Sequence, residues 1–363
     1  MANASNKFLS TSKIAYREIQ NTLMGAEIGI DKFLFGTDDF STSSECQIDR
    51  YIQDPVGVIF RHKDSESHVR PYLPGKGIYY EIPIAAEKTP ISEQLKDSVV
   101  SGLAENVDYN TAEAQRYQDI IQDHTIGHMV TRWYLALQTI RTGKFSPTGV
   151  SGADIGGLEI DFSRDASLDI TYDFTGVGAT IDLALGELID AYRAKGGSMN
   201  NACVLMGSDW LNALETDDDV MVRMQANAAN NIIELNMTPP AMRNTKGLFI
   251  VGRYRVPGRL FSVTLLGYSP DSQYTAYVGA TAADYMPSDE AVIFSTSDIR
   301  YRIGRGINAL NDSGKVIRVS GEVVFDTFNT KDPATEFMRS QARLGFIPGN
   351  VDRTARSTGT FAS

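Results

Sequence analysis

The feature that most constrains this chain is one uninterrupted helical pattern over residues 110–142. Its apolar residues step by four, three, four and three positions, which draws a single stripe along one helix face. These residues are Ile126, Val130, Trp133, Leu137 and Ile140. At about 1.5 Å per residue, such a helix would be about 45–50 Å long, which exceeds the usual globular helix. The pattern therefore predicts a strut that runs along a flat subunit.

Residues 46–88 carry the pattern of a long β-hairpin. Two strand-like stretches, 47–61 and 77–86, flank a polar tip at 62–68. The second stretch places Ile78, Tyr80, Ile82 and Ile84 on one face, in the period of two that a strand requires. Isolated two-stranded ribbons are only marginally stable in water. We therefore expect this hairpin to rest on another molecule.

The segment before the hairpin, residues 1–45, lacks the apolar density to fold alone. A short helical pattern occupies residues 14–23 of it. We expect this segment to form an arm that only a neighbouring molecule can order.

The middle of the chain, residues 150–320, alternates helical and strand patterns and predicts an α/β or α+β subdomain. A helical stripe covers residues 181–192. Short apolar runs predict buried strands at 202–206 and 248–251. Ser208 is the expected N-cap of a further short helix.

Strand patterns return over residues 316–346. The chain then closes with a segment rich in Arg, Thr, Ser and Gly, residues 350–363, which we predict to be a tail. The whole chain is therefore assigned to the α+β class.

Composition limits the classes of function. The chain has 363 residues, enough for two sizeable subdomains, and a net charge of −11. This charge argues against a nucleic-acid-binding surface as the main feature, although a container that encloses DNA remains compatible with it. Cys46 and Cys203 form no disulfide framework, which fits a reducing cytoplasm. We expect neither a signal peptide nor a membrane span.

The pattern most like that of an enzyme is the pair His124 and His128, which share one face of the long helix at i and i+4. Such a pair could hold a metal ion, but the zincin motif needs Glu directly after the first His, where Thr125 stands. Packing or a subunit contact is the simpler interpretation. No nucleophile or phosphate loop is indicated, so we expect no catalytic residue, no cofactor and no metal.

Basic residues gather in the hairpin and near the end of the chain. They are either solvated charges or contacts to acidic surfaces of neighbouring subunits, and the sequence leaves both open. The hypothetical inter-subunit contacts are Arg61, Lys63, Arg70, Lys76, Arg339 and Arg343.

The order of these segments resembles the major capsid proteins of tailed bacteriophages, the Hong Kong 97 type, and within them the lambda-type major capsid protein E family. Three stretches carry the resemblance, at 143–149, 285–294 and 332–348. No single stretch is specific, and the ordered set is what resembles the family. The resemblance implies an N-arm, an extended E-loop, a P-domain with a long spine helix, an A-domain and a C-terminal tail. In this sequence they would be residues 1–45, 46–88, 89–155 with 320–350, 156–319 and 351–363.

The resemblance also implies a function in assembly and no enzymatic activity. Hexamers and pentamers would form an icosahedral shell in the host cytoplasm and become the capsid of the virion. The shell would enclose double-stranded DNA without reading its sequence. Expected partners are a separate scaffolding protein, a portal and a cement or decoration protein, with no membrane.

Three other functions stay open. The first is a cellular nanocompartment shell of the same fold. The second is a metal-dependent hydrolase that uses His124 and His128. The third is a phage tail protein, or another structural protein, that forms rings or tubes.

Overall fold

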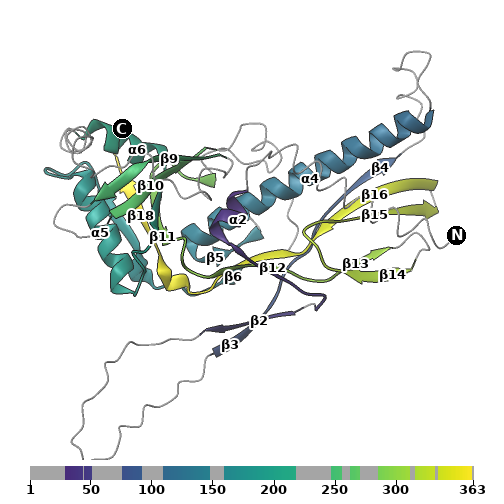
Figure 1. Ribbon diagram of the computed structural model, residues 1–363, viewed down its shortest axis with the longest axis horizontal. Helices are drawn as coiled ribbons and strands as arrows, with labels where there is room; N and C mark the ends of the chain where they lie inside the picture. Colours follow the sequence, from purple (N-terminus) through teal and green to yellow (C-terminus); the bar gives the residue numbers. More distant parts are fainter. Residues whose placement is uncertain are drawn as a thin grey trace, which may run out of the picture.

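The computed structural model describes the chain in ten stretches (Figure 1). They are residues 29–43, 45–50, 76–91, 109–147, 159–217, 247–255, 262–269, 285–310, 315–331 and 334–361. Within them, only the backbone is described for residues 45–50, 76–81, 109–116, 330–331 and 334–335. The helix predicted at 14–23 and the hairpin tip at 62–68 lie outside the described residues.

A six-stranded sheet forms one end of the molecule, with the order β7-β18-β11-β8-β10-β9. Two of its pairs, β18 with β7 and β10 with β8, are parallel, and the other three are antiparallel. Its strands are β7 (Asp169–Asp173), β8 (Ala202–Met206), β9 (Leu248–Arg255), β10 (Ser262–Tyr268), β11 (Glu290–Ser295) and β18 (Thr354–Thr360).

Helices cover both faces of this sheet. On one face, α5 (Ile181–Ala194) and α6 (Ser208–Thr216) pack over side chains that include Val204 and Ile293. The alternate side chains of the same strands, Leu205 among them, belong to a second core with α2 (Ile30–Leu34) and α4 (Tyr109–Thr142). Both faces are therefore buried, which explains why every residue of β8 is buried.

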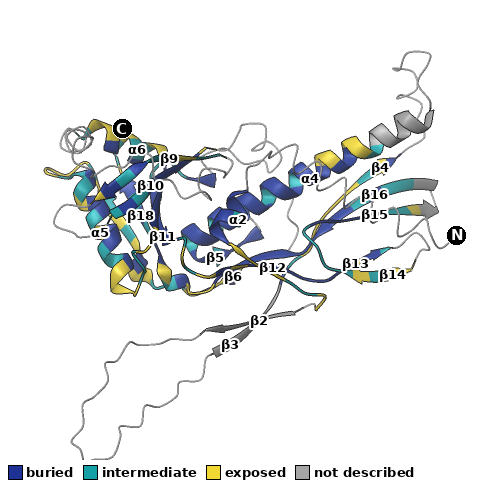
Figure 2. Ribbon diagram, viewed as in Figure 1, coloured by how far each residue is buried: buried dark blue, intermediate teal, exposed yellow. Residues whose placement is uncertain are grey.

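Helix α4 is the predicted strut, and it is confirmed from Tyr109 to Thr142. The stripe from Ile126 to Ile140 is buried throughout and packs beneath α2 and the six-stranded sheet. Nearer its amino end, Ile120 and Ile121 belong to a different core that includes Met338. Figure 2 shows α4 buried near α2 and increasingly exposed further along. One helix therefore joins two cores.

The core around Ile120, Ile121 and Met338 lies against a three-stranded antiparallel sheet with the order β15-β16-β4. These strands are β4 (Ala85–Ile91), β15 (Val324–Lys331) and β16 (Ala334–Ala342). Met338, Ser340 and Ala342 are buried on one face of β16, in the period of two that a strand requires.

Small sheets connect the two ends of the molecule. The parallel pair β1-β12 continues into β17, so that one sheet joins a segment near the start of the chain to two from nearer its end. The strands of this sheet are β1 (Thr37–Phe40), β12 (Arg300–Gly304) and β17 (Leu344–Pro348). Two further sheets have two strands each. One pairs β5 (Lys144–Phe145) with β6 (Ile160–Asp161), and the other pairs β13 (Ile307–Leu310) with β14 (Val316–Val319). The described chain also contains two 3-10 turns, η2 (Ala166–Leu168) and η3 (Val351–Arg353).

The predicted second strand of the hairpin is wrong in its extent. It divides into β3 (Lys76–Glu81), which pairs with β2 (Glu45–Arg50), and β4, which joins the sheet under α4. Residues 82–84 lie between these two strands and belong to neither. In this break Ile82 is buried, with 2% of its surface exposed, whereas Ile84 is 47% exposed. The two residues therefore do not share a face.

Two further expectations fail locally. Gly207, not Ser208, is the N-cap of α6, because the Asp209 N–H bonds to the Ser288 backbone oxygen and no capping side chain is used. The strand at 248–251 is only partly buried, because β9 is the edge of its sheet.

Residues 351–363 were expected to be a tail, but their described part is built into the body. β18 lies inside the six-stranded sheet between β7 and β11. Its buried positions are small side chains such as Ala355 and Ser357, which leave room for α5. No described helix is long and apolar enough to cross a membrane.

Candidate assembly interface

A two-stranded ribbon leaves the body of the molecule (Figure 1). β2 and β3 pair with each other in an antiparallel register that runs from Glu45 opposite Glu81 to Arg50 opposite Lys76. In the described chain they form a sheet of their own. A ribbon of this kind presents backbone N–H and C=O groups on its outer edges, which suit pairing with another chain.

The base of the ribbon is fixed at Ile82, directly after β3. The Arg343 Nε donates a hydrogen bond of 2.7 Å to the Ile82 backbone oxygen. The Ile82 side chain lies so close to Gly345 that a Cβ there would meet its Cδ1 at 2.9 Å. Both Arg343 and Ile82 are buried, so the body holds the ribbon at this root.

The segment of α2 and β1 is fixed by a cluster of charges around Arg302 on β12, a side chain that is 1% exposed. Its guanidinium contacts Asp31 Oδ2 at 3.1 Å, Asp38 Oδ1 at 2.7 Å and Glu322 Oε1 at 2.9 Å. Arg132 on α4 also reaches Glu322, at 3.1 Å. The cluster thereby ties α2, β1, β12 and α4 together.

The electrostatics of this cluster favour its charged forms. Burial opposes ionisation of Glu322, but the charges of Arg132 and Arg302 outweigh it and hold the pKa of that carboxyl well below its usual range. Burial likewise disfavours charged Arg302, yet the Asp38 hydrogen bond and the charges of Asp31 and Glu322 raise its pKa above the ordinary value. Glu322 and Arg302 are therefore both charged at neutral pH.

Two more arginines next to Arg302 hold the same segment. The Arg300 Nε donates to the Leu34 backbone oxygen at 2.6 Å, and Arg305 Nη2 contacts Asp39 Oδ2 at 3.1 Å. Sequence reasoning missed all three arginines. Their only local signal is a basic run at 300–305, and the aspartates that they contact, Asp31, Asp38 and Asp39, lie more than 260 residues away.

The histidine pair is part of the packing between α4 and the sheet beneath it. His124 Nε2 lies 2.7 Å from Thr89 Oγ1, and His128 Nε2 lies 3.0 Å from Ser340 Oγ. Burial lowers the pKa of both rings, that of His128 to about 3 with help from the charge of Arg132. No group of three or more metal-binding side chains occurs among the described residues. The two rings point to separate hydroxyl partners, as the packing interpretation predicts.

The predicted contact residues fall into two sets. Arg61, Lys63 and Arg70 lie outside the described residues, and Lys76 is described only as a backbone residue of β3 paired with Arg50. The other two have partners within the chain. Arg339 Nε bonds to Asp326 Oδ1 at 2.9 Å, and Arg343 bonds to Ile82. Contact of these six residues with a neighbouring subunit stays a prediction.

No protein-family model matches this chain, and no curated protein matches it in sequence. Solved structures do match. One, assigned as the capsid protein of a prophage of E. coli CFT073, is 12% identical and superimposes with a TM-score of 0.60 over 98% of this chain and 99% of that one.

Two others are more distant. The capsid of cyanophage P-SCSP1u is 10% identical, with a TM-score of 0.46 over 93% of this chain and 89% of that one. The structure of Gordonia phage Cozz is 12% identical, with a TM-score of 0.46 over 93% and 88%.

The prophage protein matches this chain from end to end, so the two share one α+β fold. That fold is the Hong Kong 97 type found in phage capsid proteins. The expected fold class is therefore confirmed.

Proposed function

We propose that this chain is the structural subunit of an icosahedral phage capsid. Copies would assemble into hexamers and pentamers that enclose double-stranded DNA, in the host cytoplasm and then in the virion. One observation carries the proposal: the ribbon of β2 and β3 leaves the body and forms a two-stranded sheet of its own within the described chain. The shared fold of the prophage capsid protein supports it, since that likeness covers the whole chain.

The proposal includes the division of the chain predicted from its sequence. Residues 1–45 would be the N-arm, 46–88 the E-loop, 89–155 with 320–350 the P-domain and 156–319 the A-domain. The three-stranded sheet under α4 and the six-stranded sheet support the division into two bodies. Membership of the lambda-type family, a separate scaffolding protein, a portal and a cement protein belong to the same proposal.

A subunit that contacts several neighbours is held more tightly than any single interface would hold it. A stable protein interface buries roughly 1,200–2,000 Å², and a subunit with several neighbours gains avidity from each further contact. The ribbon would lie over an adjacent copy, and its basic residues, Lys76 among them, would set the register there. A ribbon edge would add backbone hydrogen bonds.

The test removes the end of the ribbon without disturbing its root. Arg50 and Lys76 face each other in register, so a two-residue Asn-Gly turn can replace residues 51–75. The matched control makes the same change at Leu310 and Val316, which also face each other, and replaces residues 311–315.

We expect the unaltered chain, with scaffold if required, to form closed shells in negative-stain electron microscopy. The ribbon variant should keep its circular dichroism and melting temperature but form no closed shell, while the control still assembles. Intact shells from the ribbon variant would refute the proposed role of the ribbon.

The same experiments separate the other functions. Open rings or tubes in the micrographs would favour a tail protein. A packaged enzyme encoded beside the gene would favour a nanocompartment, whereas a neighbouring terminase and portal would favour the phage. Stoichiometric metal that is lost on His124→Ala would favour the hydrolase.

A further inference from the structure

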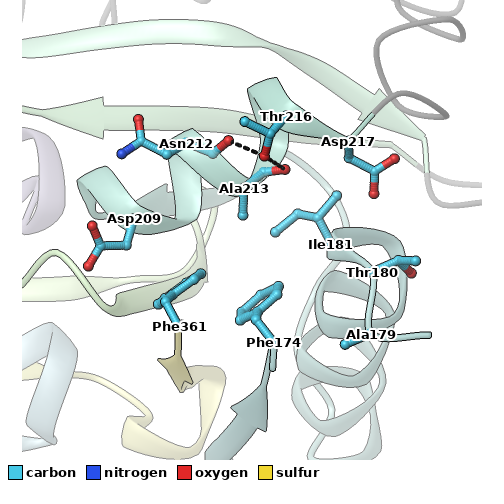
Figure 3. A pocket seen from close by; sticks show the side chains of 10 residues that line it. All are labelled: Phe174, Ala179, Thr180, Ile181, Asp209, Asn212, Ala213, Thr216, Asp217 and Phe361. Carbon is cyan, nitrogen blue, oxygen red and sulfur yellow. Dashed lines mark hydrogen bonds between the residues drawn. The ribbon is translucent and has the colours of Figure 1, made fainter. Parts of the chain in front are cut away.

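A hollow of about 660 Å³ opens between α5 and α6, beside the ends of β7 and β18 (Figure 3). Helix α6 lines it with Asp209, Asn212 and Thr216, which follow one helix face. The opposite face of α6 holds Trp210 and Leu214, both buried in the core. The hollow is thus bordered by the polar face of a helix that the core holds firmly.

Two aromatic rings border the hollow opposite α6. Phe174 follows β7 and Phe361 follows β18, and their rings stack with centroids 4.5 Å apart and planes at 11°. Phe174 also meets Trp210 edge to face at 5.1 Å. Each ring is held by another, so this side of the hollow is a fixed apolar surface.

The charged groups that line the hollow are acidic. Asp209 lies in the first turn of α6, and Asp217 is its C-cap. Asp217 comes eight positions after Asp209, a spacing of about 12 Å along a helix. Among the described lining residues none is basic. The carboxyl end of α6 also carries the negative end of its helix dipole, which attracts cations.

The amino end of α5 borders the hollow on another side. Thr180 accepts a hydrogen bond of 3.4 Å from the Leu183 N–H and caps this end. Asp182 in the first turn offsets the positive end of that dipole. Among the described residues that line the hollow, the two carboxylates are the only charged side chains.

We propose that this hollow binds a linear aliphatic polyamine, one per chain. Its terminal ammonium groups would pair with Asp209 and Asp217, and its methylene chain would lie along Phe174 and Phe361. An ammonium close to a phenylalanine face gains a cation–π contact. A compact ion such as Mg²⁺ cannot reach both carboxylates and gains nothing from the rings. The hollow belongs to a single copy, so the inference holds whether or not shells form.

The first test compares ligands on the unaltered full-length chain by isothermal titration calorimetry at low ionic strength. Spermidine should bind saturably with one site per chain. n-Butylamine, which carries one charge, and Mg²⁺, which lacks the hydrocarbon, should bind more weakly. No saturable spermidine binding, or equal displacement of spermidine by Mg²⁺ at matched charge, would overturn the proposal.

The second test uses variants. Asp209→Asn and Asp217→Asn should each weaken spermidine binding roughly fivefold, as expected for a partly exposed ion pair, and the double variant should weaken it further. The control is Glu187→Gln on the exposed side of α5, which removes the same charge outside the hollow. Equal weakening by this control would show that spermidine responds only to net charge. Unchanged circular dichroism would show that all variants fold.

Discussion

The Arg343 Nε donates a 2.7 Å hydrogen bond to the backbone oxygen of Ile82, at the point where the ribbon meets the body. Both residues are buried, and residues 82–84 belong to no strand. A buried carbonyl in an irregular segment has no ladder partner, so the arginine supplies one. Removing this bond therefore tests how much it contributes to anchoring the ribbon on the body.

Replacing Arg343 by methionine keeps an apolar stem but removes every donor. We expect a loss of about 1–3 kcal/mol in the free energy of unfolding, because the Ile82 oxygen would be left buried and unsatisfied. Urea unfolding measures it. Arg353→Met is the control, since that side chain is 45% exposed beside Asp298 and its ion pair contributes up to about 1 kcal/mol. Equal losses in the two variants would contradict the anchoring role.

Replacing Arg302 by methionine should be more damaging, by about 3–5 kcal/mol, because it leaves Asp31 charged and buried without its partner. Arg302→Lys should recover little, since an ammonium cannot reproduce the guanidinium fork. Hydrogen exchange would then accelerate in residues 29–40. Lys144→Met, which breaks an exposed pair with Glu159, should leave that exchange unchanged. Slow exchange at 29–40 in Arg302→Met would show that the segment of α2 and β1 is held by something else.

The low pKa of His128, about 3 because of burial, predicts a loss of stability in acid. Between pH 6.5 and 3 the unfolded chain binds a proton at this ring and the folded chain does not. The loss in free energy of unfolding is zero above pH 6.5 and grows by about 1.4 kcal/mol for each pH unit between 6.5 and 3. His128→Gln should flatten the slope of urea-unfolding free energy against pH, leaving the smaller part due to His124. An unaltered slope would mean that His128 is protonated in the folded chain.

Replacing two glycines by alanine should change the stability of the protein in opposite directions. A Cβ at Gly207 would lie 2.1 Å from the Pro287 backbone oxygen, so Gly207→Ala must displace the backbone at the start of α6 and should cost about 1–3 kcal/mol. At Gly186 on α5 a Cβ meets nothing within 4 Å, and Gly186→Ala should stabilise the helix by up to about 1 kcal/mol. Thermal unfolding of both variants tests this, and shifts of the same sign would contradict it.

Local patterns predicted the elements whose stability is local in origin. The stripe of α4 has the right period over several turns, so its existence and its ends could be read within one residue. The break in the ribbon had a signal that was missed. Pro83 interrupts the alternation between Ile82 and Ile84, and proline has no N–H to give to a strand ladder.

Other elements could not be predicted because their partners are distant in the sequence. β18 has small and polar residues with no apolar alternation, and it is buried only because α5 and neighbouring strands enclose it. Arg302 is a surface-type residue until the fold brings Asp31 and Asp38 beside it. The candidate hollow likewise depends on Phe174 and Phe361 meeting across 187 positions of sequence.

Helix α4 carries a mechanical consequence. One half packs against the sheet that contains β4, and the other half ends at Arg141, which bonds to Glu290 on β11 at 2.7 Å. β4 is also the continuation of the ribbon beyond Ile82. A force applied to β4 would therefore travel along a single stiff rod to the far end of the same molecule. A change in packing on one side of such a molecule can alter its shape on the other.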